Sequence, residues 1–117
     1  MSGAWAREAD SAVCLEAWNL ADAALWLANS LNCTGTGRAA SLLNASAIIR
    51  RERRRLDPEG VSERSRDWPE TVSDEALIWT ALRMVASVDV GGNAEGRAWW
   101  LRQAESALRT LHKRGRS

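Results

Sequence analysis

The chain has 117 residues, of which 45% are hydrophobic and 26% are charged, and its formal net charge is +1. This length allows one domain with a hydrophobic core and leaves no room for a second. The near-neutral charge gives no overall attraction to nucleic acid or to an anionic membrane. No apolar run reaches the length of a membrane span, and the first residues lack the basic and apolar segments of a secretory signal. We therefore expect a cytoplasmic single domain, residues 1–117, without a membrane partner.

Residue usage is uneven in a way that points to the genome. The chain contains seven Trp but no Phe or Tyr, and fifteen Arg beside one Lys. The favoured residues have GC-rich codons and the avoided ones AT-rich codons. This bias indicates a high-GC host, such as an actinobacterium, or a phage or other mobile element that lives in one. It also accounts for part of the Trp and Arg content without any function.

The stretch from Trp5 to Leu31 predicts a long first helix, because apolar residues recur at alternating spacings of four and three without Gly or Pro. A helix that is apolar around most of its circumference is expected to be covered on most sides, by other helices or by a second chain. The stripe expected to face the core consists of Val13, Ala17, Leu20, Ala24, Leu27 and Leu31. A second strip beside it consists of Cys14, Trp18, Ala21 and Leu25, while Leu15 and Trp26 point to the far side.

Two cysteines fall at the middle and just beyond the end of this helix. If the helix is continuous, Cys14 and Cys33 lie about 28 Å apart, which is far beyond the reach of a disulfide bond. We expect both to be reduced thiols.

Three further helices follow, separated by turn-forming residues. Residues 38–56 have an apolar face and end at Asp57-Pro58. Residues 61–69 are polar and aperiodic, so we expect a loop anchored by Trp68. A third helix begins at the N-cap Ser73 and ends at Gly91-Gly92.

The last helix starts at the candidate cap Asn93 and ends before Gly115. No segment shows strand-like alternation. The fold class is therefore all-α, a four-helix bundle-like single domain with a long first helix and antiparallel neighbours.

The arginine run at the end of the second helix has two interpretations. One is a nucleic-acid contact. The other is ion pairing within the bundle, since residues 38–66 carry a net charge of +4 and residues 67–96 one of −5. In an up-down bundle, the end of the second helix would lie beside the starts of the first and third helices and the end of the fourth. We prefer pairing within the bundle, because charge runs are commonly solvated faces or interhelical pairs. The candidate nucleic-acid contacts are Arg50, Arg51, Arg53, Arg54 and Arg55.

Residues 38–46 (RAASLLNAS) contain Ala39-Ala40, Leu42-Leu43, Asn44 and Ser46. This pattern resembles the first helix and turn of a helix-turn-helix of the factor-for-inversion-stimulation type. The resemblance implies that the arginines lie on a helix that enters the major groove. The inward positions of that second helix fall on Arg50 and Arg54, however, and a continuous helix better explains Ile49 and Leu56. A DNA-binding regulator using residues 38–56 is the alternative function.

Residues typical of catalytic or metal sites are few. His112 is the only histidine, which excludes a His-pair metal motif, and neither cysteine has a second ligand at metal-binding spacing. The Gly-rich stretches at 34–37 and 91–96 lack the Lys-Ser/Thr of a P-loop. We assign no catalytic, cofactor-binding or metal-binding residue, and we expect neither an enzyme nor a cofactor.

Tryptophans on the polar sides of helices favour protein–protein contacts, because exposed Trp commonly anchors interfaces. The candidate interface residues are Leu15, Trp18, Trp26 and Trp99. We predict a non-catalytic helical interaction or regulatory protein, such as a phage- or mobile-element-encoded inhibitor or adaptor with an unidentified protein partner. We also predict a homodimer in which the Leu15 region of one first helix meets the Trp26 region of the other. In the rival arrangement, the 61–69 loop covers this face through Trp68 and the chain is monomeric.

Overall fold

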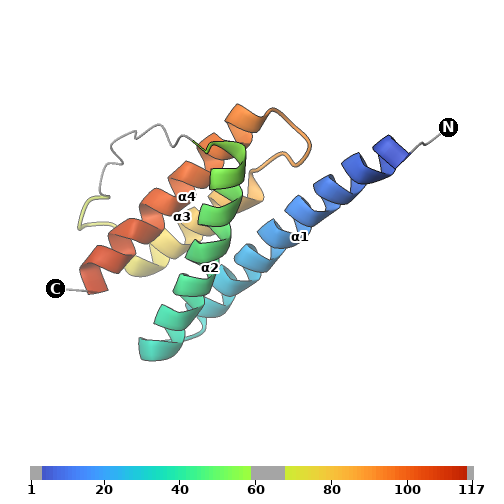
Figure 1. Cartoon of the computed structure of the whole chain (residues 1–117). Helices are drawn as coiled ribbons and strands as arrows, with labels where there is room; N and C mark the ends of the chain where they lie inside the picture. Colours follow the sequence, from blue (N-terminus) through green and yellow to red (C-terminus); the bar gives the residue numbers. More distant parts are fainter. Residues whose placement is uncertain (1–3, 59–67, 116–117) are drawn as a thin grey trace.

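The computed structural model describes residues 4–58 and 68–115, with side chains from residue 12 onward. It contains four helices: α1 (Ala4–Leu31), α2 (Gly35–Leu56), α3 (Asp74–Ala86) and α4 (Ala94–Gly115) (Figure 1). These two ranges contain no strand. The prediction of an all-α, four-helix bundle-like fold with a long first helix is confirmed.

Helix boundaries follow the turn residues, with two differences. Helix α2 begins three residues before the predicted start, at Gly35, whose φ of 57° suits glycine. Helix α3 ends at Ala86, well before Gly91-Gly92. The hydroxyl and the backbone N–H of Ser87 both donate to the carbonyl of Arg83, at 2.7 and 3.0 Å, and so close the helix earlier.

Both predicted N-terminal caps are confirmed. The Ser73 hydroxyl accepts a hydrogen bond from the backbone N–H of Ala76 at 3.1 Å. The side-chain oxygen of Asn93 accepts from the N–H groups of Glu95 and Gly96, at 2.8 and 3.3 Å. Short polar side chains thus satisfy N–H groups that a helix start leaves without partners.

The order of helix directions differs from the prediction. Helix α1 packs against α2 and α3, and α4 packs against α2 and α3. Each packed pair is antiparallel, so the chain runs up, down, down and up, and α2 and α3 point the same way (Figure 1). The start of α3 therefore lies beside the start of α2, where Arg38 pairs with Glu75 at 3.1 Å, and not beside its end. The start of α3 also meets the end of α4, where Arg114 pairs with Asp74 at 3.0 Å.

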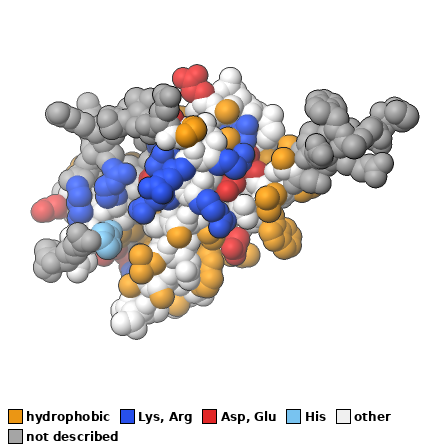
Figure 2. Space-filling model, viewed as in Figure 1, with side chains coloured by type: hydrophobic (Ala, Val, Ile, Leu, Met, Phe, Trp, Pro, Cys, Tyr) orange, Lys and Arg blue, Asp and Glu red, His pale blue; other side chains and the backbone are white. Residues whose placement is uncertain are grey.

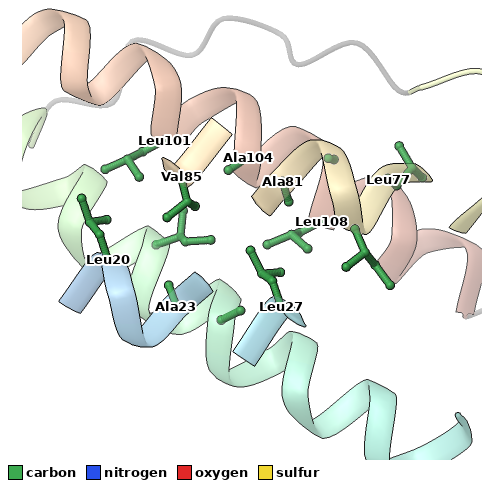
Figure 3. Close-up of a cluster of buried hydrophobic side chains, with 13 residues drawn as sticks. Leu20, Ala23, Leu27, Leu77, Ala81, Val85, Leu101, Ala104 and Leu108 are labelled. Carbon is green, nitrogen blue, oxygen red and sulfur yellow. The ribbon is translucent and has the colours of Figure 1, made fainter. Parts of the chain in front are cut away.

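All four helices contribute to one hydrophobic core (Figure 3). Small residues at Ala23, Ala81 and Ala104 allow the helices to approach closely, and larger side chains fill the spaces between them. The core consists of Leu20, Ala23, Leu27, Ala45, Ile49, Leu77, Ile78, Ala81, Val85, Leu101, Ala104, Ala107 and Leu108.

The predicted anchor Trp68 is confirmed, although residues 59–67 of the predicted loop lie outside the described residues. Trp68 is partly buried against the core, and its backbone N–H donates to the hydroxyl of Thr110 at 3.2 Å. Thr110 belongs to α4, which lies diagonally across the bundle from α1. Trp68 therefore does not cover the outer side of α1.

The predicted core-facing stripe of α1 is wrong in its rotation. Val13 and Ala17 are exposed, and of the predicted stripe only Leu20 and Leu27 are fully buried. The buried side of α1 consists of Glu16, Leu20, Ala23, Leu27 and Ser30. At 100° per residue, this side is turned by about 60° from the predicted one. Two of its five members are polar, so apolar periodicity alone does not identify it.

Candidate protein interface

The outer side of α1 carries the two most exposed large hydrophobic side chains of the described residues, Trp18 and Leu25, and also Leu15. Trp18 is 77% exposed, Leu25 69% and Leu15 60%. Cys14, Trp18, Ala21 and Leu25 are all exposed and follow one another at spacings of four, three and four. We call these four residues the outer stripe. On the helical wheel the outer stripe lies about 180° from the buried side, and Figure 2 shows hydrophobic side chains along α1.

In the sequence, these four residues form a strip beside the predicted core-facing stripe, and only Trp18 among them is a predicted interface residue. Its 4-3-4 spacing is as regular as that of the predicted core-facing stripe, so periodicity cannot rank the two. Ala21 and Leu25 were therefore missed as surface residues. The additional signal in the sequence was Glu16, because a carboxylate on one side of an apolar helix, with arginines elsewhere in the chain, permits a buried ion pair.

Of the four predicted interface residues, Leu15 and Trp18 share the outer side of α1. Trp26 does not, because it is partly buried and packs against the hydrophobic core. Trp99 is 42% exposed but belongs to α4, where its ring makes an edge contact with Trp100 at 4.8 Å between ring centroids. The structure therefore places two of the four predicted interface residues, Leu15 and Trp18, on one surface. A dimer contact through Leu15 would have to use a residue other than Trp26 of the second chain, because Trp26 packs against the core.

A buried ion-pair cluster fixes the rotation of α1. Glu16 is 3% exposed and accepts hydrogen bonds from Arg55 of α2 and Arg97 of α4. Arg55 also reaches Glu52, which is 3% exposed, at 3.5 Å. Asn19 donates to the other oxygen of Glu52 at 3.4 Å. Rotating α1 to bury Trp18 would expose Glu16 and leave Arg55 and Arg97 without this carboxylate as a partner. The ion-pair cluster therefore keeps the outer stripe on the surface.

A second polar contact holds the other end of α1. The side chain of Arg38 donates to the backbone carbonyl of Ser30 at 2.9 Å, and the Ser30 hydroxyl donates to the carbonyl of Leu27 at 2.6 Å. Arg38 also pairs with Glu75 of α3. Because α1 is held near both ends of its packed part, its outer side is presented in a defined orientation.

Between residues 12 and 31, the outer side of α1 is almost free of charge. Between residues 12 and 31 the only charged side chains are Glu16, which is buried, and Asp22, which is exposed. No Lys or Arg lies in this part of the helix. This part of the surface therefore offers no basic side chain to a phosphate group. Its apolar character suits a protein surface.

The arginine run divides between the bundle and the surface. Arg53 pairs with Glu105 at 2.6 Å, and this hydrogen bond raises the pKa of Arg53. Arg55 pairs with Glu16 and Glu52, whereas Arg51 only approaches Glu52, at 3.9 Å. The partners lie on α1, on α2 itself and at the middle of α4, as the helix order described above requires. Arg50 and Arg54 are exposed and make no ion pair with the described residues.

Helix α2 is continuous from Gly35 to Leu56, so it contains no turn at Asn44. The helix-turn-helix arrangement suggested by residues 38–46 is therefore absent. Ile49 is fully buried and Leu56 packs against the core, as a continuous helix requires.

A groove of about 670 Å³ runs between the first half of α2 and the second half of α4. Leu42, Leu108 and Leu111 line it with apolar surface, and Arg50, Arg109 and His112 add basic groups. Figure 2 shows Lys and Arg side chains gathered over α2 and α4. This groove is the second surface with a distinct character, and its charge suits an anionic ligand.

Within the described ranges, no three His, Cys, Asp or Glu side chains are grouped so as to hold a metal ion. No helix in those ranges combines the length and apolarity needed to cross a membrane. The free cysteines Cys14 and Cys33 form no disulfide bond, as predicted.

Comparisons with known proteins do not add to this description: no protein family, no curated protein and no solved structure matches the chain significantly. The functional inference therefore depends on the outer side of α1 and on the groove between α2 and α4.

Proposed function

We propose that this protein is a non-catalytic helical interaction protein, which acts through protein–protein contacts made by the outer side of α1. The observation that supports this most strongly is the 77% exposure of Trp18 within a regularly spaced apolar stripe. Single exposed hydrophobic residues are normal on soluble proteins. A continuous stripe anchored by Trp is typical of an interaction surface.

The distribution of residues around α1 strengthens this proposal. The helix buries Glu16 and Ser30 and exposes Trp18 and Leu25. Burying a carboxylate costs free energy that its ion pairs only partly offset, and exposing Trp forgoes the gain from burial. Such a distribution is costly for an isolated chain. It becomes favourable overall if a partner covers the outer side.

An interaction surface on one helix of a small domain suits a regulator, an inhibitor or an adaptor. The uneven residue usage supports a phage or mobile element of a high-GC host as its source, and we place its action in the cytoplasm. These roles share the requirement that a protein partner contacts Trp18.

Photocrosslinking tests the proposal at single positions. A benzoylphenylalanine in place of Trp18 or Leu25 is expected to give covalent protein adducts in cells, whether with the same chain or with another protein. Leu43 of α2 is the matched control, since it is 63% exposed and Leu25 is 69% exposed. Adducts that form equally well from position 43, or none from positions 18 and 25, would contradict an interface on α1.

A second candidate function is DNA binding by the basic surface of α2 and α4. It is supported by the exposure of Arg50 and Arg54 without ion pairs to described residues. Without a helix-turn-helix, such binding would rely on phosphates, and its affinity would fall steeply with rising salt. Changing Arg50 and Arg54 to Gln should then weaken duplex binding without changing the stability of the fold. Binding that persists in this variant, or that is insensitive to salt, would remove this candidate.

A further inference from the structure

We infer that the partner on the outer side of α1 is a second copy of this chain, with the two α1 helices paired antiparallel. The two-fold axis passes between residues 19 and 20. This inference rests on the proposed function and adds the identity of the partner and the register of the contact.

The register follows from the spacing of the outer stripe. Its positions, 14, 18, 21 and 25, are symmetric about the midpoint between 19 and 20. In an antiparallel pair with this centre, Trp18 lies opposite Ala21 of the second copy, and Cys14 lies opposite Leu25. The largest side chain thus meets the smallest, and the pairing repeats on both sides of the axis, as a two-fold interface requires.

A parallel pair would fit less well. It would place Trp18 opposite Trp18 and Ala21 opposite Ala21, which alternates a crowded layer with a gap. It would also place the two Asp22 carboxylates side by side on a surface that lacks a basic residue between positions 12 and 31. In the antiparallel register, Asp22 lies level with Ala17 of the second copy, and the two carboxylates are offset by about 7.5 Å along the helix.

The shape of the molecule leaves room for this contact. The first turns of α1 extend beyond the ends of the other helices (Figure 1). In the antiparallel register, residue 11 of one copy lies level with residue 28 of the other. The projecting end of each α1 therefore lies along the packed half of its partner, on the side away from both bundles.

Trp18 alone supplies a substantial part of the area that a small dimer needs. A Trp side chain has an accessible area of up to about 250 Å², so Trp18, at 77% exposure, presents roughly 190 Å². Two copies supply roughly 380 Å² from Trp18 alone, about a third of the 1,200 Å² at which specific interfaces begin. Leu25, at 69% exposure, adds to this in each copy, and Leu15, at 60% exposure, borders the outer stripe.

Disulfide trapping tests the register, because Cys14 is an exposed thiol. In a Cys33→Ser background, the Leu25→Cys substitution is expected to give a covalent dimer under mild oxidation with copper phenanthroline. Peptide mass analysis should show a link between positions 14 and 25. The Cys33→Ser protein alone should give no covalent dimer, because its two Cys14 residues lie about 16 Å apart along the helices.

Two outcomes would overturn the register. A link between Cys14 and Cys14 in the Cys33→Ser protein would indicate parallel pairing. An equal yield of covalent dimer from Leu43→Cys, which places a matched exposed thiol on α2, would indicate random collision. Neither result would contradict a protein interface on α1.

Light scattering tests the dimer without crosslinking. At micromolar concentration the native protein should have twice the chain mass of 12.9 kDa. The Trp18→Glu variant should have the mass of one chain and an unchanged helical circular dichroism spectrum. A monomeric native protein that still gives photoadducts with another protein from position 18 would overturn the self-pairing and leave the proposed function standing. A monomer without such adducts would overturn both.

Discussion

Removing Arg97 tests whether the buried ion pairs fix the position of α1. Arg97 is 17% exposed in its side chain and Glu16 only 3%, so the contact between them is largely shielded from water. Breaking one side of a buried pair costs about 3–5 kcal/mol, because the remaining charge is left buried. Arg55 continues to pair with Glu16, but its side chain is 51% exposed and also serves Glu52. We therefore expect Arg97→Met to lower the free energy of unfolding by about 3 kcal/mol.

The measurement is urea unfolding followed by circular dichroism. With an m-value of about 1.5 kcal/mol per M, typical of a small domain, the midpoint should fall by about 2 M. The double variant Glu16→Leu/Arg97→Met removes both charges and should recover most of this loss, since well-packed apolar residues often replace a buried pair without cost. Glu52 keeps Arg55 and Asn19 in that variant. A midpoint unchanged by Arg97→Met, or no recovery in the double variant, would refute the role given to this cluster.

Three further changes test the core, a cap and a surface pair. Leu27→Ala should lower the free energy of unfolding by about 2–5 kcal/mol, because Leu27 is fully buried. The control is Leu43→Ala: Leu43 is 63% exposed, so its truncation should change the free energy of unfolding by under about 0.5 kcal/mol. Ser73→Ala should cost about 1 kcal/mol in the same assay, because the N–H of Ala76 loses its acceptor; no change would show that this N–H is satisfied by water. The pKa of Glu75 is lowered by a hydrogen bond from its own backbone N–H and then by Arg38. Its stabilising effect is therefore present at neutral pH and is lost as the pH falls through the ordinary glutamate range and below it. Arg38→Gln should raise this pKa part of the way back, as seen by NMR titration of the side chain, and an unchanged pKa would show that the pair does not form in solution.

Local signals predicted the helices well because their causes are local. Ser73 and Asn93 cap the helices that follow them, and each bond spans only two or three residues. The buried face of α3, which includes Leu77 and Val85, follows its apolar periodicity for a similar reason, since this helix has one dominant apolar side. A short helix with a single apolar side leaves little choice about which side is buried.

The rotation of α1 was not predictable from periodicity because several of its sides are apolar. The choice among them depends on Glu16 meeting Arg55 and Arg97, which are 39 and 81 positions away in the sequence. Which glutamate meets which arginine depends on the order of the helices, and the charge balance of the segments is compatible with either order. The prediction of the helix order therefore failed for the same reason as the prediction of the rotation.

These two errors have a common consequence for the interface. With the wrong rotation, Leu15 and Trp26 are predicted to point to the far side of α1, although Trp26 packs against the core. Once Glu16 and Ser30 define the buried side, the exposed side has to be the one that carries Trp18 and Leu25. The buried charges and the exposed apolar stripe are thus two aspects of one arrangement. The ion pairs hold α1 in an orientation that the hydrophobic effect within a single chain would disfavour, and a second α1 at the outer stripe would make that orientation favourable.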